Sequence, residues 1–188
     1  TLPQASDACE IIINLPAFQL QVYRKGQPMR SYPIAVGKEV TPTALGTTHI
    51  INKVADPTYY PPDWGKRGLK PIPPGPRNPV GTRWLGLAIK GYGIHGTNDP
   101  SSIGRAESAG CIRMLNTDVE ELSDLVRVGT PVTFVYEPLL LWLDPRSGWP
   151  MVQVHPDIYG QRYPTVERAS EHLWQLGIQS PVHEPGLS

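Results

Sequence analysis

Net charge, long apolar runs and cysteine are scarce in this 188-residue sequence. Lysine and arginine together number 17, as do aspartate and glutamate, so the formal net charge is zero. A balanced charge gives no electrostatic footprint for nucleic acid or an anionic membrane surface, so we expect neither partner. No apolar run approaches the roughly 18 residues that a membrane-spanning helix needs. These absences leave enzymes and binding modules that act on other ligands.

Histidine and cysteine occur together in one stretch, residues 94–115. His95 and Cys111 are 16 positions apart, and small and polar residues fill the interval. A thiolate attacks carbonyls far better than a thiol, and an adjacent imidazole can take the thiol proton and stabilise the thiolate as an ion pair. A cysteine alone is more often a small buried hydrophobe, so the combination carries the argument. The pattern predicts a cysteine nucleophile with a histidine base.

The residues around this pair resemble a known family. His95-Gly96-Thr97, followed by Ser108-x-Gly110-Cys111-Ile112-Arg113-Met114, is similar to the signature of the L,D-transpeptidases, the YkuD-type catalytic domain of bacterial cell-wall enzymes. The resemblance covers about residues 10–136, with further landmarks at 41–43, 78–82 and 129–132. Ala109 is a departure, because the family usually has histidine immediately before the Gly-Cys pair.

The resemblance implies that Cys111 is the nucleophile and His95 the general base. Glycine has no Cβ, so Gly110 lets the backbone approach a substrate, and the N–H groups of Gly110 and Cys111 could face a developing oxyanion. The carbonyl of Gly96, or of a neighbour, could accept the second imidazole N–H and set the tautomer. Ser108 is expected to hydrogen-bond within the loop or to substrate.

Two more residues are candidates for substrate binding. Arg113 could hold a substrate carboxylate bidentately or, equally, fasten the loop through backbone carbonyls. Trp84 is a second candidate. The five histidines show no paired spacing typical of a metal site, so we expect no metal and no cofactor. A disulfide between Cys9 and Cys111 would silence the nucleophile, which favours two free thiols.

The expected activity is cross-linking of peptidoglycan between third residues of stem peptides, through a thioester on Cys111 and with release of D-alanine. Tetrapeptide stems would serve as donor and acceptor. Alternatives are an L,D-carboxypeptidase, a relative that attaches a protein to the wall, and a non-catalytic peptidoglycan-binding module. The resemblance implies export to the cell envelope, in the periplasm or exposed at the wall, although no signal sequence is visible in this chain. We expect a monomer.

The predicted fold is mainly β, a YkuD-like sandwich or meander with a helix after the cysteine loop. Apolar and polar residues alternate over 18–23, strands are also expected at 31–36, 84–89 and 132–136, and Thr117 to Glu120 has the spacing of a capping box. Residues 56–79 contain eight prolines and predict a long loop, either a lid over the substrate groove or surface packing. We expect a catalytic domain over 1–137 and, packed against it, an extension over 138–188 with a short helix at 165–176.

Overall fold

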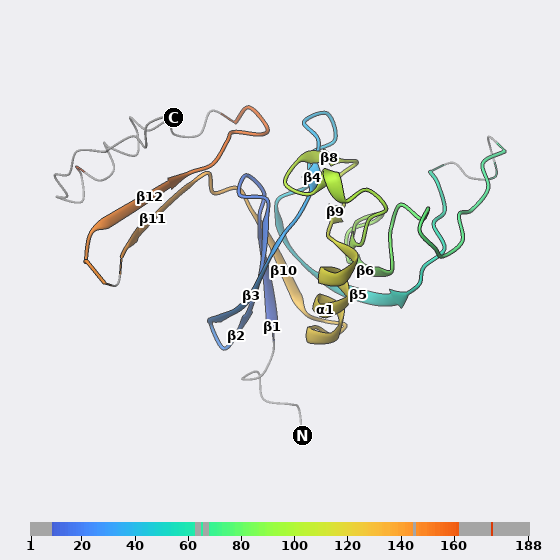
Figure 1. The fold of residues 1–188 in the computed structure, drawn as a ribbon, viewed down its shortest axis with the longest axis horizontal. Helices are drawn as coiled ribbons and strands as arrows, with labels where there is room; N and C mark the ends of the chain where they lie inside the picture. The colour runs from blue at the N-terminus through green and yellow to red at the C-terminus, as the bar shows by residue number, and fades with distance from the viewer. Residues whose placement is uncertain (1–8, 63–64, 66–67, 145, 162–173, 175–188) are drawn as a thin grey trace, which may run out of the picture. The chain divides into compact units, whose positions relative to one another are not determined.

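The computed structural model describes residues 9–62, 65, 68–144, 146–161 and 174. The chain divides into two compact units, Thr1–Tyr136 and Glu137–Ser188, and each is described here by itself. Figure 1 shows the elements of both units.

The first unit contains a curled eight-stranded sheet, so the predicted mainly β fold is confirmed. Its strand order is β3-β2-β1-β10-β5-β6-β7-β9 (Figure 1). The bounds are β1 Cys9–Asn14, β2 Gln19–Arg24, β3 Gln27–Pro33, β5 Gly46–Ala55, β6 Arg83–Leu87, β7 Gly93–His95, β9 Ile112–Arg113 and β10 Pro131–Val135. A separate short parallel pair joins β4 (Val36–Gly37) to β8 (Ala106–Ser108).

The first three strands form the predicted antiparallel meander. Leu20 and Val22 are fully buried, while Gln19, Gln21 and Tyr23, which alternate with them, are half-buried, as the alternating pattern requires. The turns lie at Phe18 and at Lys25-Gly26, where the backbone takes positive φ values of 49°, 54° and 72°. Register and turn chemistry therefore agree with the sequence at this end of the sheet.

The middle of the sheet departs from a simple meander. β1 pairs in parallel with β10, which follows α1 far along the chain, and β10 pairs antiparallel with β5. The sequence analysis did not identify β5. Only Thr48 and Ile50 are buried on this ten-residue strand, so most of it lacks the alternation that reveals a strand.

Helix α1 (Asn116–Leu125) follows the cysteine block as predicted and packs against β6 and β7. The predicted capping box is wrong. The N-cap is Leu115, which makes no side-chain cap bond, and the Thr117 hydroxyl donates to Asp118 instead. Gly129 has a φ of 90° but does not cap the helix, which already ends at Leu125; its N–H donates to the carbonyl of Ile50 on β5.

The core of this unit is formed by aliphatic side chains of the sheet and by residues on the inner face of α1. The largest fully buried ones are Ile11, Ile13, Leu15, Leu20, Val22, Ile34, Ile50, Leu85, Ile94, Ile112, Met114 and Leu122.

The proline-rich stretch between β5 and β6 is a loop, as its composition predicts. Tyr59 and Ile72 form an isolated bridge with N–H to O distances of 2.9 and 2.8 Å, which ties the two limbs of the loop together. The buried Asn78 side chain donates to the carbonyl of Pro57 at 2.6 Å and accepts from the Val80 N–H. The loop is thus fastened at its base, and its role as a lid or wall stays a prediction.

The second unit contains a β-hairpin that the sequence analysis did not identify, β11 (Leu139–Leu143) and β12 (Pro150–Val154). Asp144 accepts hydrogen bonds from the Arg146 N–H at 2.9 Å and the Ser147 hydroxyl at 2.8 Å, which shapes the turn. Apart from Trp174, the predicted helix at 165–176 lies outside the described residues. None of the helices in the described part of the chain has the length and apolar character needed to cross a bilayer.

Candidate active site

Three short strands at one end of the sheet carry the predicted site residues. His95 on β7 is the partner of Trp84 on antiparallel β6 and of Arg113 on parallel β9. Partner residues on adjacent strands point to the same face of a sheet. The register therefore brings the side chains of Trp84, His95 and Arg113 to one face, as a row across three strands.

Cys111 immediately precedes β9 and lies beside β7. Because Ile94 pairs with Ile112 in parallel register, Cys111 lies level with Gly93, two residues before His95. Side chains two apart on a strand share a face, so the Cys111 thiol and the His95 ring are on the same side. Residues distant in sequence are thereby brought to neighbouring positions.

The His95 ring is buried and anchored. Its Nδ1 lies 2.6 Å from the carbonyl oxygen of Gly96, the residue named as a candidate partner. A carbonyl only accepts, so in the neutral ring Nδ1 carries the proton and Nε2 is the free base. Burial lowers the pKa of His95 to about 4, with a smaller contribution from the charge of Arg113, against the opposing effect of the Gly96 bond. The imidazole is neutral at neutral pH.

Trp84 packs on the base. Its ring stacks on His95 with centroids 5.6 Å apart and planes 19° from parallel. A Cβ on Gly93 would lie 2.5 Å from the Trp84 ring, so glycine at this position is what admits the indole. Trp84 was named as a substrate-binding candidate; in the structure its contacts are with His95 and Gly93.

Cys111 is half-buried, and its surroundings disfavour the thiolate. It donates to the Gly91 carbonyl at 3.4 Å. Burial raises its pKa, and a backbone hydrogen bond from Gly93 and the charge of Arg113 oppose that rise. A neutral imidazole on the same face as a thiol of raised pKa differs from the ion pair expected from the sequence.

A tight turn presents Cys111. The Ser108 hydroxyl donates to the Cys111 carbonyl at 2.5 Å and accepts the Gly110 N–H at 3.0 Å, so Ser108 bonds within the loop. The Gly110 N–H is occupied by this bond, which leaves the Cys111 N–H as the remaining donor of the expected oxyanion pair. Gly110 has a φ of 113°, and a Cβ there would meet the Tyr92 hydroxyl at 3.0 Å.

Thr43 also fastens the turn and was missed by the sequence reasoning. Its hydroxyl donates to the Gly110 carbonyl at 2.9 Å and accepts the Gly37 N–H at 2.9 Å. The motif around residues 41–43 carried the family resemblance, but nothing in its composition indicated a contact 67 residues away in the chain. β4 is thereby joined to the nucleophile loop.

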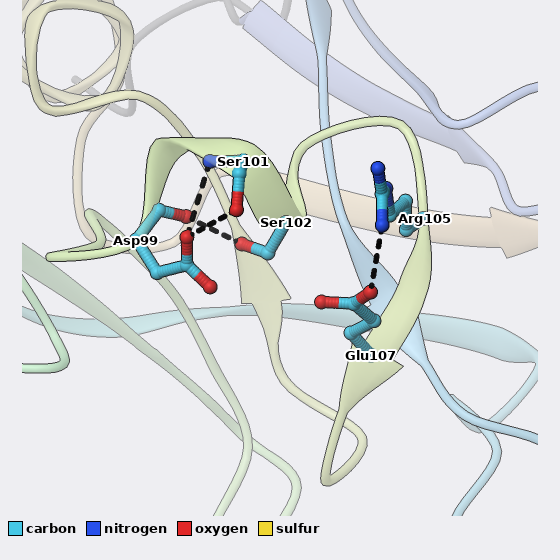
Figure 2. Close-up of polar contacts among 5 residues, drawn as sticks. All are labelled: Asp99, Ser101, Ser102, Arg105 and Glu107. Atoms are coloured by element: carbon cyan, nitrogen blue, oxygen red, sulfur yellow. Dashed lines mark hydrogen bonds and ion pairs between the residues drawn. The ribbon is translucent and has the colours of Figure 1, made fainter.

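The loop between His95 and Cys111 holds its own shape, as Figure 2 shows. Asp99 accepts from the N–H and the hydroxyl of Ser101 at 3.2 and 2.6 Å, and its carbonyl accepts from the Ser102 hydroxyl at 2.7 Å. These bonds cap the short 3₁₀ turn Pro100–Ser102. Arg105 and Glu107 lie 3.5 Å apart in an exposed ion pair further along.

Arg113 contributes charge to the site. Its backbone exchanges hydrogen bonds with Ala35, at 3.0 Å from its N–H and 2.9 Å to its carbonyl. Within the part of the chain described, its guanidinium forms no ion pair with a carboxylate. Its charge lowers the pKa of both His95 and Cys111, which locates a half-buried cation close to both groups.

The described residues contain no evident set of metal ligands. Among the residues that the structure describes, no group of three or more histidine, cysteine, aspartate or glutamate side chains is arranged to hold a metal ion. Cys9 and Cys111 are both free thiols, and Cys9 is buried with its Sγ 3.7 Å from the Leu125 carbonyl.

Fold and register together define a mainly β protein with Cys111 and His95 at neighbouring positions at one end of the sheet. Residues 10–134 match the YkuD family, described as the L,D-transpeptidase catalytic domain. The chain therefore belongs to the L,D-transpeptidase catalytic-domain family.

Curated relatives agree with this assignment. A putative L,D-transpeptidase YkuD of Bacillus licheniformis is 42% identical over 123 residues, covering 65% of this chain and 63% of that protein. A probable L,D-transpeptidase YcfS of Escherichia coli is 32% identical over 160 residues, covering 77% of this chain and 49% of that protein. The chain spans less than two thirds of the length of these relatives.

A solved structure gives the same fold. The catalytic domain of an Enterococcus faecium L,D-transpeptidase is 27% identical with a TM-score of 0.54, and the match covers 70% of this chain and 99% of that domain. The same domain has also been solved acylated by ertapenem, with 27% identity, a TM-score of 0.54, and 69% and 98% coverage.

Proposed function

We propose that this chain is a peptidoglycan L,D-transpeptidase that works through a thioester on Cys111. The observation that carries the proposal is the shared face of β7 and β9. There a thiol lies beside an imidazole whose Nδ1 is engaged by Gly96, so that Nε2 is the available base. Membership of the family supports the substrate class.

Acylation begins from the neutral pair. As Sγ attacks the carbonyl carbon of the third stem residue, His95 Nε2 takes the thiol proton. The Cys111 N–H faces the developing oxyanion. When the tetrahedral intermediate collapses, the imidazolium gives its proton to the amine of the departing D-alanine, and a thioester remains.

Transfer reverses these roles. The side-chain amine of a second stem attacks the thioester carbonyl and loses a proton to His95, and the departing sulfur regains that proton. One amide replaces another, so no ATP is needed. A site that excludes water favours the amine over hydrolysis, and the Trp84 ring beside His95 contributes apolar surface to that end.

Arg113 is the proposed carboxylate ligand. An arginine that forms no ion pair with any described carboxylate, close to the proposed nucleophile and base, suits the carboxylate of the donor stem, because its fork of N–H groups matches that group. We further propose that residues 1–137 form the catalytic domain, that 138–188 form a C-terminal extension, and that the protein works as a monomer in the cell envelope.

A non-catalytic peptidoglycan-binding module is a second candidate, favoured by one observation. Ala109 stands where the family usually has histidine and is exposed beside the nucleophile. The thiolate therefore lacks that polar neighbour. An L,D-carboxypeptidase, in which water replaces the amine, would use the same acylation step.

The experiment is an intact-protein mass spectrum after incubation with a disaccharide tetrapeptide, with and without a diamino-acid amine. The transpeptidase should show an acyl adduct that maps to Cys111, is absent from Cys111→Ala, and is discharged by the amine. Release of trimmed tripeptide without dimer would indicate the carboxypeptidase. Binding that survives Cys111→Ala, with no D-alanine release by reduced wild-type protein, would indicate the binding module.

A further inference from the structure

Asn116 is the first residue of α1, yet its side chain does not cap that helix. Its Oδ1 accepts the Thr82 N–H at 3.3 Å and the Thr97 N–H at 3.2 Å. One amide oxygen thus joins the end of the proline-rich loop to the segment that follows His95. The N-cap position itself, Leu115, has no side-chain bond.

Two glycines make room for this oxygen. A Cβ on either Gly81 or Gly96 would lie 2.1 Å from Asn116 Oδ1, a distance no real contact allows. A Cβ on Gly81 would also lie 2.7 Å from the Gly96 backbone. Gly81, Gly96 and Asn116 therefore fit together only because neither glycine has a side chain. Such close packing leaves the Gly96 backbone little conformational freedom.

Asn116 and His95 bond opposite ends of one peptide group. The Thr97 N–H that donates to Asn116 and the Gly96 carbonyl that accepts from His95 Nδ1 belong to the same planar amide. Fixing the N–H therefore fixes the direction of the carbonyl. A hydrogen bond at one end of an amide also polarises the other end, which strengthens the bond to the imidazole.

We propose that Asn116 is a positioning residue that sets the tautomer of His95 through the Gly96–Thr97 peptide group. The inference deepens the proposed function, on which it rests for the role of His95 as base. Asn116 touches neither the thiol nor the ring; it acts by holding the acceptor that keeps the proton on Nδ1 and leaves Nε2 free. Replacing the Asn116 side chain should change the tautomer of the His95 imidazole more than it changes the stability of the fold.

The direct test is ¹⁵N NMR of the His95 ring in full-length wild type, Asn116→Leu and Asn116→Asp, with Thr117→Ala as the matched control. Thr117 is the next residue of the helix, is exposed, and its hydroxyl bonds only within the helix start. In wild type and Thr117→Ala the proton should reside on Nδ1. Asn116→Leu, similar in size but without an acceptor, should shift population to the Nε2–H form.

Asn116→Asp keeps an acceptor oxygen and adds a charge that a helix N-terminus favours. It should therefore retain the Nδ1–H form and raise the His95 pKa above that of wild type. A wild-type ring protonated on Nε2 would overturn the inference without any variant. So would unchanged ¹⁵N shifts and pKa in both Asn116 variants, whatever their melting temperatures, because that would leave Asn116 with a structural role alone.

Activity adds a second readout. Asn116→Leu should lower kcat for D-alanine release by about 10- to 100-fold with little change in KM, while Asn116→Asp restores most of it, since misdirected catalytic groups cost rates of this order. If wild type releases no D-alanine, the proposed function fails. The tautomer measurement, which needs no substrate, still decides the role of Asn116.

Discussion

The two ends of the eight-stranded sheet are built differently. At the β3-β2-β1 end, longer antiparallel strands bury aliphatic side chains on one face and expose polar ones on the other. At the β6-β7-β9 end, strands of five, three and two residues carry a buried histidine and two buried glycines, and a half-buried cysteine immediately precedes the last strand. The first end stabilises the fold by burying apolar area. The second holds polar groups in place through hydrogen bonds and close backbone packing.

This difference teaches where each kind of substitution should act. At the β3-β2-β1 end, called the meander end below, truncating a buried side chain should lower the free energy of unfolding and leave the activity of the folded protein unchanged. At the β6-β7-β9 end, called the site end below, small substitutions should lower activity much more than they lower stability. The reason is that catalysis depends on sub-ångström placement of the reacting groups. The following substitutions test that contrast.

The largest effect is expected from Gly110→Ala. An alanine there must adopt a φ of 113° and approach the Tyr92 hydroxyl at 3.0 Å, which displaces the turn that presents Cys111. D-alanine release should fall about 100-fold. Gly104→Ala is the matched control, since that glycine has a φ of 83° but nothing within 4 Å of an added Cβ. Equal losses in both variants would show that backbone strain alone, rather than the site contact, governs activity.

Ile13→Ala should have the complementary effect at the meander end. Ile13 is fully buried in the middle of β1, so truncation leaves a cavity and should cost about 2 to 5 kcal/mol of unfolding free energy, against about 0.5 to 1.5 kcal/mol for Ile13→Val. Urea denaturation measures both values. In denaturant-free buffer, at a temperature where the variant remains folded, its kcat should match that of wild type. A loss of kcat as large as that of Gly110→Ala would contradict the contrast between the two ends of the sheet.

The pH dependence of stability should report the buried base. The pKa of His95 is about 4 in the folded protein against 6.5 ordinarily, so the unfolded chain binds more protons between these values. Stability should therefore be full above about pH 6.5 and fall as the pH drops toward 4, by about 3 kcal/mol in total. His95→Gln should remove most of this slope in denaturation curves. Part of the remaining slope should come from His155, because burial lowers its pKa as well.

The smallest effect should come from Arg30→Gln. Arg30 lies at the meander end and pairs with Glu121 of α1 at 2.8 Å, but both side chains are about half exposed, at 55% and 47%. Solvent screens such a pair, so its removal should leave both the urea midpoint and D-alanine release nearly unchanged. A clear loss of activity would mean that α1 transmits changes from this end of the sheet to the site.

The sequence predicted the meander end well because its information is local. Alternation at Leu20 and Val22 and the Arg24-to-Gln27 turn depend on neighbouring residues, which periodicity detects. It also paired His95 with Cys111, because both residues lie in one short stretch and the resemblance supported the pair. The helix after the cysteine loop was predicted, but its start was misplaced because the predicted capping box is not used in the structure.

The rest of the site could not be predicted because its contacts are long-range and polar. Thr43 reaches Gly110 across 67 positions, and Asn116 reaches Thr82 across 34. Neither residue lies in a periodic pattern. Strand β5 was missed for a related reason, because its partners β10 and β6 determine its pairing while most of its side chains are exposed.

The hydrogen bond from the Cys111 thiol to the Gly91 carbonyl also affects the rate at which oxidants react with this sulfur. Peroxides and alkylating agents react with thiolates, so a sulfur that keeps its proton reacts slowly with them. Burial raises the pKa of Cys111, and the bond to Gly91 needs the proton on sulfur, so both favour the thiol over the thiolate. In the proposed function, the nucleophile would therefore be held between reactions as a thiol, which is converted to sulfenic acid only slowly.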